Sequence, residues 1–114
     1  MYIYNITLKV DWSIHDRWLR WMSEDEIPRM LETGYFTKHQ MMHLLEIDEE
    51  DGPTYAIQYQ TESLEHYQNY MKEQSPVDTA HTYAMWGQQC LFFTTLMEII
   101  DKVKTLSGKG CKSL

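Results

Sequence analysis

The order of strand-like and helix-like stretches constrains the fold of this chain more than any other feature. Residues 2–10 alternate two unlike sets of side chains, as a strand with two different faces does. One set is aromatic or aliphatic and consists of Tyr2, Tyr4, Ile6, Leu8 and Val10. The other set is Ile3, Asn5, Thr7 and Lys9. We therefore expect the chain to open with a β-strand.

A helix is expected next. Ser13 with Asp16 three residues later resembles a capping box, and apolar residues then recur at helical spacing as far as Met22. Pro28 does not fit a helix interior because its nitrogen carries no hydrogen, so residues 23–27 should contain a kink or a restart. Pro28 suits the first turn of a short second piece that reaches Gly34.

The middle of the chain predicts a β-hairpin. Residues 38–48 and 54–61 have the composition of two strands. Between them, residues 50–53 include Asp51-Gly52, which supplies the positive φ that a tight reversal requires. We expect a short turn at this position.

The last third of the chain predicts two helices and a final strand. Ser63 can cap one helix, and Ser75 can cap the next, with Pro76 at its first position. Gly87 can end that second helix. Residues 91–100 are rich in Phe, Thr, Leu and Ile, and we expect them to form a strand.

The resulting order of elements is β, α, β, β, α, β. Because crossover connections are right-handed, this order predicts an α+β, ferredoxin-like domain over residues 1–100, with a four-stranded antiparallel sheet and helices on one face. The other face, with Ile3, Met42 and Leu44 directed outward, favours burial, and we expect a homodimer that pairs through this open sheet face. Residues 101–114 contain four lysines without apolar periodicity, which indicates a flexible basic tail.

Composition excludes several classes of partner. The 114 residues carry a formal charge of −7, which argues against nucleic-acid binding because phosphate neutralisation needs clustered basic side chains. No apolar stretch approaches the roughly 20 residues of a membrane span, and the N-terminus lacks the pattern of a secretory signal. We expect a cytoplasmic protein, with Cys90 and Cys111 as reduced thiols.

Several stretches together resemble a bacterial family built on a domain of unknown function. They are MYIYNITLKV, WLRWM, EIPRMLETGYF, HLLEIDEEDGPTYAIQY and FFTTLMEI. The resemblance extends to about Ile100 and implies the dimeric α/β barrel superfamily, in which two ferredoxin-like sheets face each other. That superfamily includes cofactor-free monooxygenases, haem-degrading enzymes, isomerases and ligand-binding modules of transcription factors. The resemblance also implies a histidine before Ile27-Pro28, where this chain has Glu26.

Aromatic side chains are the first candidates for a binding site. The residues predicted to contact a ligand are Trp18, Trp21, Tyr59 and Trp86. Such rings could line a cavity between helices and sheet in which a flat apolar ligand stacks. The alternative is that they form the hydrophobic core, as aromatic residues at helix and strand spacing usually do.

Two residues are candidates for catalysis through the family resemblance. Asn5 and His81, together with Trp86, resemble the amide, imidazole and tryptophan of haem-degrading members of the superfamily. In that arrangement the imidazole would ligate iron and the amide would hydrogen-bond a distal ligand. The alternative for His81 is a surface pair with Asp78, three residues earlier on the same helix.

Two further catalytic candidates follow from residue chemistry. His43 could project into a pocket, or it could hydrogen-bond a neighbouring carboxylate. Glu26 could act as a general base if an apolar cleft raised its pKa, or it could belong to a solvated acidic face. His39 and His43 are four residues apart on a strand, roughly 13 Å, so no metal site is expected there.

These observations favour a homodimeric binding or regulatory module with an aromatic cavity for a small apolar or aromatic molecule and no resident cofactor. A cofactor-independent monooxygenase or a haem-degrading type of enzyme, using His81 or His43 with Asn5, is the alternative. A purely structural dimer is the third hypothesis.

Overall fold

The computed structural model describes residues 1–101, and the rest of the predicted basic tail, Cys111 included, lies outside the described residues. Four strands form one antiparallel sheet in the order β2-β3-β1-β4. The strands are β1 (Tyr2–Val10), β2 (Lys38–His43), β3 (Thr54–Thr61) and β4 (Cys90–Glu98). This confirms the α+β, ferredoxin-like prediction.

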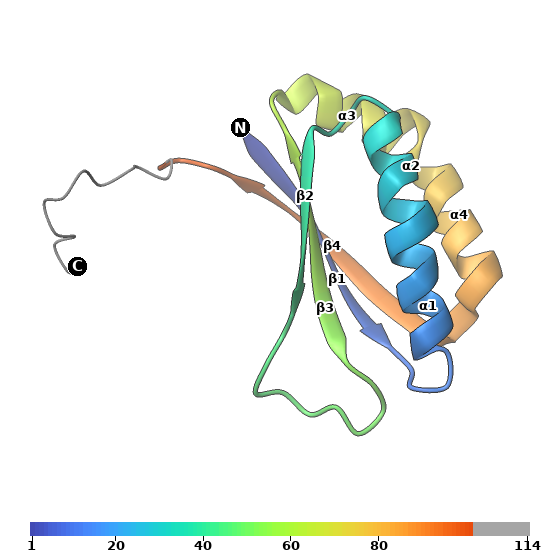
Figure 1. The fold of residues 1–114 in the computed structure, drawn as a ribbon. Coiled ribbons are helices and arrows are strands. Elements are labelled where there is room, and N and C mark those ends of the chain that lie inside the picture. Colours follow the sequence, from blue (N-terminus) through green and yellow to red (C-terminus); the bar gives the residue numbers. More distant parts are fainter. Residues whose placement is uncertain (102–114) are drawn as a thin grey trace, which may run out of the picture.

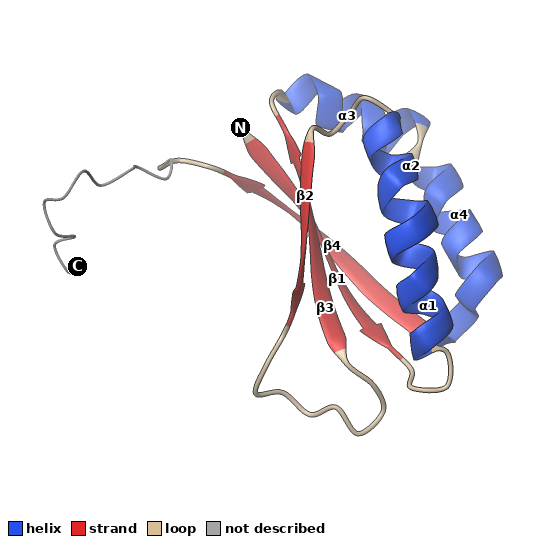
Figure 2. Cartoon of the chain, viewed as in Figure 1, coloured by secondary structure: helices blue, strands red, loops and turns tan. Residues whose placement is uncertain are grey.

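The helices lie on one side of the sheet, as Figures 1 and 2 show. They are α1 (His15–Trp21), a π-helical segment (Met22–Glu26), α2 (Ile27–Glu32), α3 (Leu64–Glu73) and α4 (Ser75–Trp86), followed by a 3-10 turn (Gly87–Gln89). No helix of residues 1–101 covers the opposite face of the sheet. In the same range, no helix combines the length and the apolar composition needed to cross a membrane.

The central strand β1 divides its side chains between the two faces of the sheet. Tyr4, Leu8 and Val10 are at most 4% exposed and belong to the core under the helices. Tyr4 and Ile6 lie opposite Tyr59 and Ile57 of β3, which are also buried there. The alternation in residues 2–10 thus corresponds to one packed face and one open face.

The predicted capping box at the first helix is wrong, whereas the kink or restart expected at residues 23–27 takes the form of a π-helical segment in a continuous helix. Ser13 donates from its backbone nitrogen and its hydroxyl to Asp11 Oδ1, at 2.8 and 2.7 Å, and α1 begins without a side-chain cap. The backbone nitrogen of Ser13 therefore donates to Asp11, and not to Asp16 as a capping box would require. Pro28 lies in the first turn of α2, immediately after the π-helical segment that joins α2 to α1.

The hairpin differs from its prediction in length and in turn type. Strand β2 ends at His43 rather than continuing to residue 48, and residues 44–53 form a long loop. Gly52 does not form a tight reversal. A Cβ atom at Gly52 would lie 1.8 Å from the Val10 carbonyl oxygen, so glycine is required by the close approach of two backbones. Hydrogen bonds from Val10 N to Pro53 O (3.0 Å) and from Trp12 N to Asp51 O (3.1 Å) hold that approach.

The predicted ends of the later helices are largely confirmed. Ser63 Oγ accepts a hydrogen bond from His66 N at 3.0 Å and so caps α3. The predicted cap at Ser75 is wrong, because α3 and α4 follow each other almost directly and Gln74 occupies the cap position without a side-chain bond. Gly87, with φ of 57°, ends α4 as expected.

Candidate functional site

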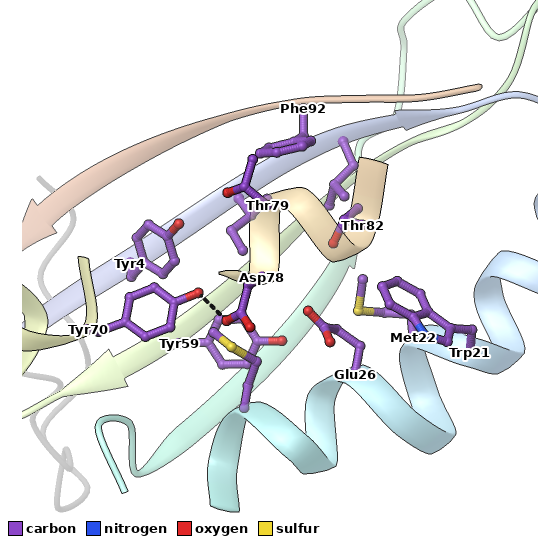
Figure 3. Close-up of a pocket in the computed structure, with 13 residues that line it drawn as sticks. Tyr4, Trp21, Met22, Glu26, Tyr59, Tyr70, Asp78, Thr79, Thr82 and Phe92 are labelled. Carbon is purple, nitrogen blue, oxygen red and sulfur yellow. Dashed lines mark hydrogen bonds between the residues drawn. The ribbon is translucent and has the colours of Figure 1, made fainter. Parts of the chain in front are cut away.

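A pocket lies between the sheet and the helical layer (Figure 3). Its walls include residues of β1 and β3 on the sheet side and of the π-helical segment, α3 and α4 on the helical side. The cavity volume is about 40 Å³. Because a water needs roughly 10–15 Å³ by the same kind of measure, this is room for a few waters or one small chemical group. The most exposed lining residues are Thr79 and Phe92, so the pocket opens between α4 and β4.

The polar end of the pocket consists of two carboxylates that share one guanidinium. Arg29 donates to Glu26 Oε1 from Nε at 3.1 Å and from Nη2 at 2.6 Å. Its Nη1 lies 3.0 Å from Asp78 Oδ1. Gln74 Nε2 also donates to Asp78 Oδ1 at 3.0 Å, and the Tyr70 hydroxyl donates to Asp78 Oδ2 at 2.9 Å (Figure 3). Arg29 thereby connects the π-helical segment to α4.

The two carboxylates differ in how many of their oxygens accept hydrogen bonds. Both oxygens of Asp78 accept hydrogen bonds. Glu26 accepts only at Oε1, and no group of residues 1–101 donates to its Oε2. The side chain of Glu26 is 12% exposed, and burial raises the pKa of its carboxyl group, while the hydrogen bonds and charge of Arg29 lower it in part.

Tyr59 adds a second polar atom to the pocket. Its side chain is 1% exposed and lines the cavity, and its hydroxyl makes no hydrogen bond within the described part of the chain. Burial raises the pKa of this phenol, with the negative charge of Glu26 adding to the effect. Tyr59 is therefore a neutral phenol, and its hydroxyl is available to a group in the pocket.

The local sequence explains how Glu26 reaches the pocket. Glu24 and Asp25 are exposed, whereas Glu26 is turned inward at the end of the π-helical segment. In that segment Ile27 N bonds Met22 O, five residues earlier, which changes the phase of the helix before Pro28. Arg29 is three residues after Glu26 on the same helical face, the spacing at which such side chains meet.

This arrangement has two chemical capabilities. With both acids ionised, two carboxylates and one guanidinium leave one negative charge in excess inside the pocket. A proton on Glu26 or a cation in the cavity would neutralise it. Aromatic and thioether side chains, including Tyr4, Trp21 and Met30, form the apolar remainder of the wall.

Of the four aromatic residues predicted to bind a ligand, the structure places two at the pocket. Trp21 and Tyr59 line it. Trp18 is fully buried and stacks on Tyr55, with ring centroids 5.4 Å apart. Trp86 packs edge-on against Trp21 at 5.6 Å. The indole nitrogens of Trp18 and Trp86 are buried and have no hydrogen-bond partner among residues 1–101.

The structure does not bring Asn5 and His81 together. Asn5 is 9% exposed and lies on the open face of the sheet, where it donates to Thr7 Oγ1 (3.0 Å) and accepts from Gln58 Nε2 (3.3 Å). His81 is an exposed residue of α4, on the helical side. An iron ligated by His81 could not also be approached by Asn5 of the same chain, so these residues do not fit the haem arrangement. Asp78, expected to pair with His81 at the surface, is buried instead.

His43 belongs to a separate cluster at the other end of the covered face. His43 Nε2 lies 2.6 Å from Glu49 Oε2, which is the carboxylate partner expected as its alternative role. Its ring also contacts Tyr55, whose hydroxyl lies 2.6 Å from His15 Nε2. Within the described residues, no three His, Cys, Asp or Glu side chains form a group that could hold a metal ion.

Sequence reasoning missed Arg29, Tyr70 and Asp78 as site residues. The Glu26–Arg29 spacing of three could have indicated an ion pair. Asp78 gave no such signal, because acids near the start of a helix commonly serve the helix itself. Its contacts with Arg29 and Tyr70 join three helices and depend on the tertiary fold.

Comparison with known sequences identifies the family. A family described as Domain of unknown function (DUF4286) matches residues 1–100. The chain belongs to this family. The matched range includes every element of the pocket and the whole sheet. No curated protein matches the sequence significantly.

Three solved structures share the fold of this DUF4286 domain. A proposed antibiotic biosynthesis monooxygenase from Deinococcus radiodurans has a TM-score of 0.66 and 10% identity, over 94% of this chain and 100% of that one. A dimeric ferredoxin-like protein from an uncultured marine organism has a TM-score of 0.63 and 8% identity, over 90% and 97%. An ethyl tert-butyl ether D (EthD) family protein from Bacillus halodurans C-125 has a TM-score of 0.62 and 12% identity, over 88% and 100%. At these identities the likeness concerns the fold alone.

Proposed function

We propose that this DUF4286 domain is a homodimeric module that binds a small molecule in the pocket between its sheet and its helices. The observation that carries the proposal is the pocket itself, where a helical layer otherwise packed by aromatic rings leaves space beside unused polar atoms of Glu26 and Tyr59. Binding sites are typically apolar clefts with a few convergent polar groups, and this pocket has that character.

The volume of the pocket decides how much of a ligand it can enclose. A dry cavity of about 150 Å³ is known to accept benzene, and this one has about 40 Å³. The aromatic residues of the sequence favoured an apolar or aromatic ligand, but a ring exceeds this volume. The proposal is therefore that a compact head group enters and that the rest of the molecule extends past Thr79 and Phe92 at the opening.

A variant that fills the opening tests binding at this pocket. Thr82→Phe places a ring at the mouth, and Ala84→Phe places the same ring on an exposed position of the same helix. A panel of water-soluble fragments of about three to six heavy atoms is added to protein carrying ¹³C-labelled methionine methyls. We expect hits that shift the pocket residues Met22 and Met30, that are lost in Thr82→Phe and that persist in Ala84→Phe. A panel in which no fragment shifts Met22 or Met30 would contradict the proposal.

Homodimerisation is supported by the character of the open sheet face. Along β4 it exposes Leu91 (59%), Phe93 (62%) and Met97 (38%), whose backbone partners on β1 also face away from the helices. Its centre holds three neutral amide side chains joined by hydrogen bonds. Gln40 Nε2 donates to Gln58 Oε1, and Gln58 Nε2 donates to Asn5 Oδ1. Lys9 and Lys38 are the charged side chains that the strands place on this face. In a chain with a formal charge of −7, a face with so few charges and no carboxylate on its strands suits a second copy of itself. The likeness to a fold described as dimeric adds support.

A further inference from the structure

We infer that the head group accepted by the pocket is an organic ammonium ion, held by the free oxygen of Glu26 and the free hydroxyl of Tyr59. This inference rests on the proposed binding function and names the chemical class of the ligand. It is carried by three features of the site: its charge, its unused hydrogen-bonding atoms and the character of its walls.

The charge of the site selects a cation. Among residues 1–101, the charged side chains that line the cavity are Glu26 and Asp78, and Arg29 neutralises one of the two carboxylates. A net negative charge in a half-buried site is costly unless it is compensated. A single positive charge on the ligand would supply that compensation, whereas a carboxylate or a phosphate would add to the repulsion.

Each nitrogen of Arg29 already serves a carboxylate and Arg29 does not line the cavity, so the guanidinium does not provide an anion site there. Its Nε and Nη2 serve Glu26, and its Nη1 serves Asp78. Both oxygens of Asp78 are likewise occupied, by Gln74 and Tyr70 as well as Arg29. Within the residues that the structure describes, the unused atom of the carboxylate pair is Glu26 Oε2.

The unused oxygens around the cavity can all accept hydrogen bonds, as an ammonium group requires, although the hydroxyls can also donate. Glu26 and Tyr59 line the pocket and carry the unused Oε2 and hydroxyl oxygens, and Thr79 and Thr82 contribute hydroxyl oxygens to its wall. An ammonium group has three donors and no acceptor. Two acceptors inside and a hydroxyl at the mouth match that number.

The walls favour the same class of ligand. Five of the lining residues are aromatic, namely Tyr4, Trp21, Tyr59, Tyr70 and Phe92. The faces of such rings attract cations, most strongly where water is excluded. The volume of about 40 Å³ admits an ammonium with its first carbon and leaves the remainder of a primary amine at the opening.

The test compares three probes that have the same carbon chain. The ¹⁵N-labelled full chain is titrated with n-butylammonium, n-butanol and butyrate, and the indole N–H signals of Trp21 and Trp12 are followed. Trp21 lines the pocket, whereas Trp12 is half-exposed and bonded to the Glu49 carbonyl oxygen in the hairpin loop. We expect saturable shifts of Trp21 with n-butylammonium, binding of n-butanol weaker by about tenfold or more, no binding of butyrate, and an unchanged Trp12.

A matched pair of variants isolates Glu26. Glu26→Gln and Glu24→Gln remove the same charge from the same helical segment, but only Glu26 lines the pocket. We expect Glu26→Gln to weaken n-butylammonium by about tenfold or more while its spectrum stays dispersed, and Glu24→Gln to leave the affinity unchanged. An equal loss in both variants would overturn the inference.

The probes also separate this inference from the proposed function. If n-butanol or butyrate binds the pocket as well as n-butylammonium does, the pocket binds ligands but the ammonium assignment is wrong. If none of the three shifts Trp21 and the fragment panel also fails, the proposed function falls together with the inference.

Discussion

The two faces of the sheet use the same strands in opposite ways. On the covered face, aromatic and aliphatic side chains such as Tyr4 and Ile57 are almost completely buried, and polar groups gather in two clusters, one around Glu26 and Asp78 and the other around His43. On the open face, neutral amides at the centre hydrogen-bond one another, Lys9 and Lys38 are the charged side chains of the strands, and the apolar side chains along β4 are exposed. The difference matches the two proposed roles, in which a compact ligand completes the covered face and a second copy of the chain completes the open one.

The largest expected effect concerns the core of the covered face. Trp18 is fully buried and stacks on Tyr55, so Trp18→Ala should lower the free energy of unfolding by about 3–5 kcal/mol. Gln40→Ala, on the open face, removes the side-chain hydrogen bond from Gln40 to Gln58 and should lower the free energy of unfolding by at most about 1 kcal/mol. Urea denaturation of both variants at one protein concentration gives the comparison. Equal losses would mean that Trp18 is not a core residue.

The next effect concerns pairing through the open face. Phe93→Asp places a charge among the exposed apolar residues of β4 and should weaken dimerisation by about 2–4 kcal/mol. Tyr83→Asp is its control, because Tyr83 is 63% exposed on α4 and Phe93 is 62% exposed on the sheet. Sedimentation equilibrium should give the mass of one chain for Phe93→Asp and of two for Tyr83→Asp. The reverse assignment would place the interface on the helices.

A smaller effect separates the buried carboxylate from the exposed one. Asp78→Asn leaves the Arg29 and Tyr70 donors without a charged acceptor, and should cost about 1–3 kcal/mol of unfolding free energy. Asp25→Asn removes the same charge from an exposed position and should change stability by about 0.5 kcal/mol or less. Thermal unfolding of the two variants makes the comparison. A neutral Asp78→Asn would show that the shared guanidinium does not stabilise the helical layer.

The smallest effect is the pH dependence that Glu26 contributes. Burial raises the pKa of Glu26 in the folded state, with Arg29 opposing the shift, so the folded chain holds this proton more tightly than the unfolded chain. As pH rises from the ordinary glutamate pKa of 4.5 through the raised value, the unfolded chain loses the proton first, and wild-type stability falls. The variant Glu26→Gln has no carboxyl group at this position, so it does not undergo this pH-dependent loss of stability. The unfolding free energy of Glu26→Gln relative to wild type should therefore rise with pH, and a flat or falling difference would contradict the raised pKa.

Local patterns predicted the fold well, because each element carried its own signal. The alternation of residues 2–10, the helical irregularity before Pro28 and the glycine at position 87 all depend on neighbouring residues, and the structure confirms them. The glycine at position 52 was explained by a tight turn, which is wrong. Glycine is needed there because the Val10 backbone, far away in sequence, leaves no space for a side chain.

The site was less predictable, because it is assembled from separate elements. Glu26 was found from its chemistry and its place beside a helix break. Asp78 could not be found in this way, because its burial follows from packing of α4 against Arg29 and Tyr70. Trp18 and Trp21 illustrate the same limit. Both belong to the apolar pattern of α1, but only Trp21 lines the pocket.

Solvent paramagnetic relaxation of the methionine methyls tests the division between the two faces most directly. In a single chain, Met42 and Met97 of the open face are each 38% exposed, and Met85 of α4 is 43% exposed. With a soluble gadolinium reagent, the account predicts strong broadening of Met85 and protection of Met42 and Met97, because a second copy covers the open face. Broadening of Met42 and Met97 as strong as that of Met85 would contradict the account.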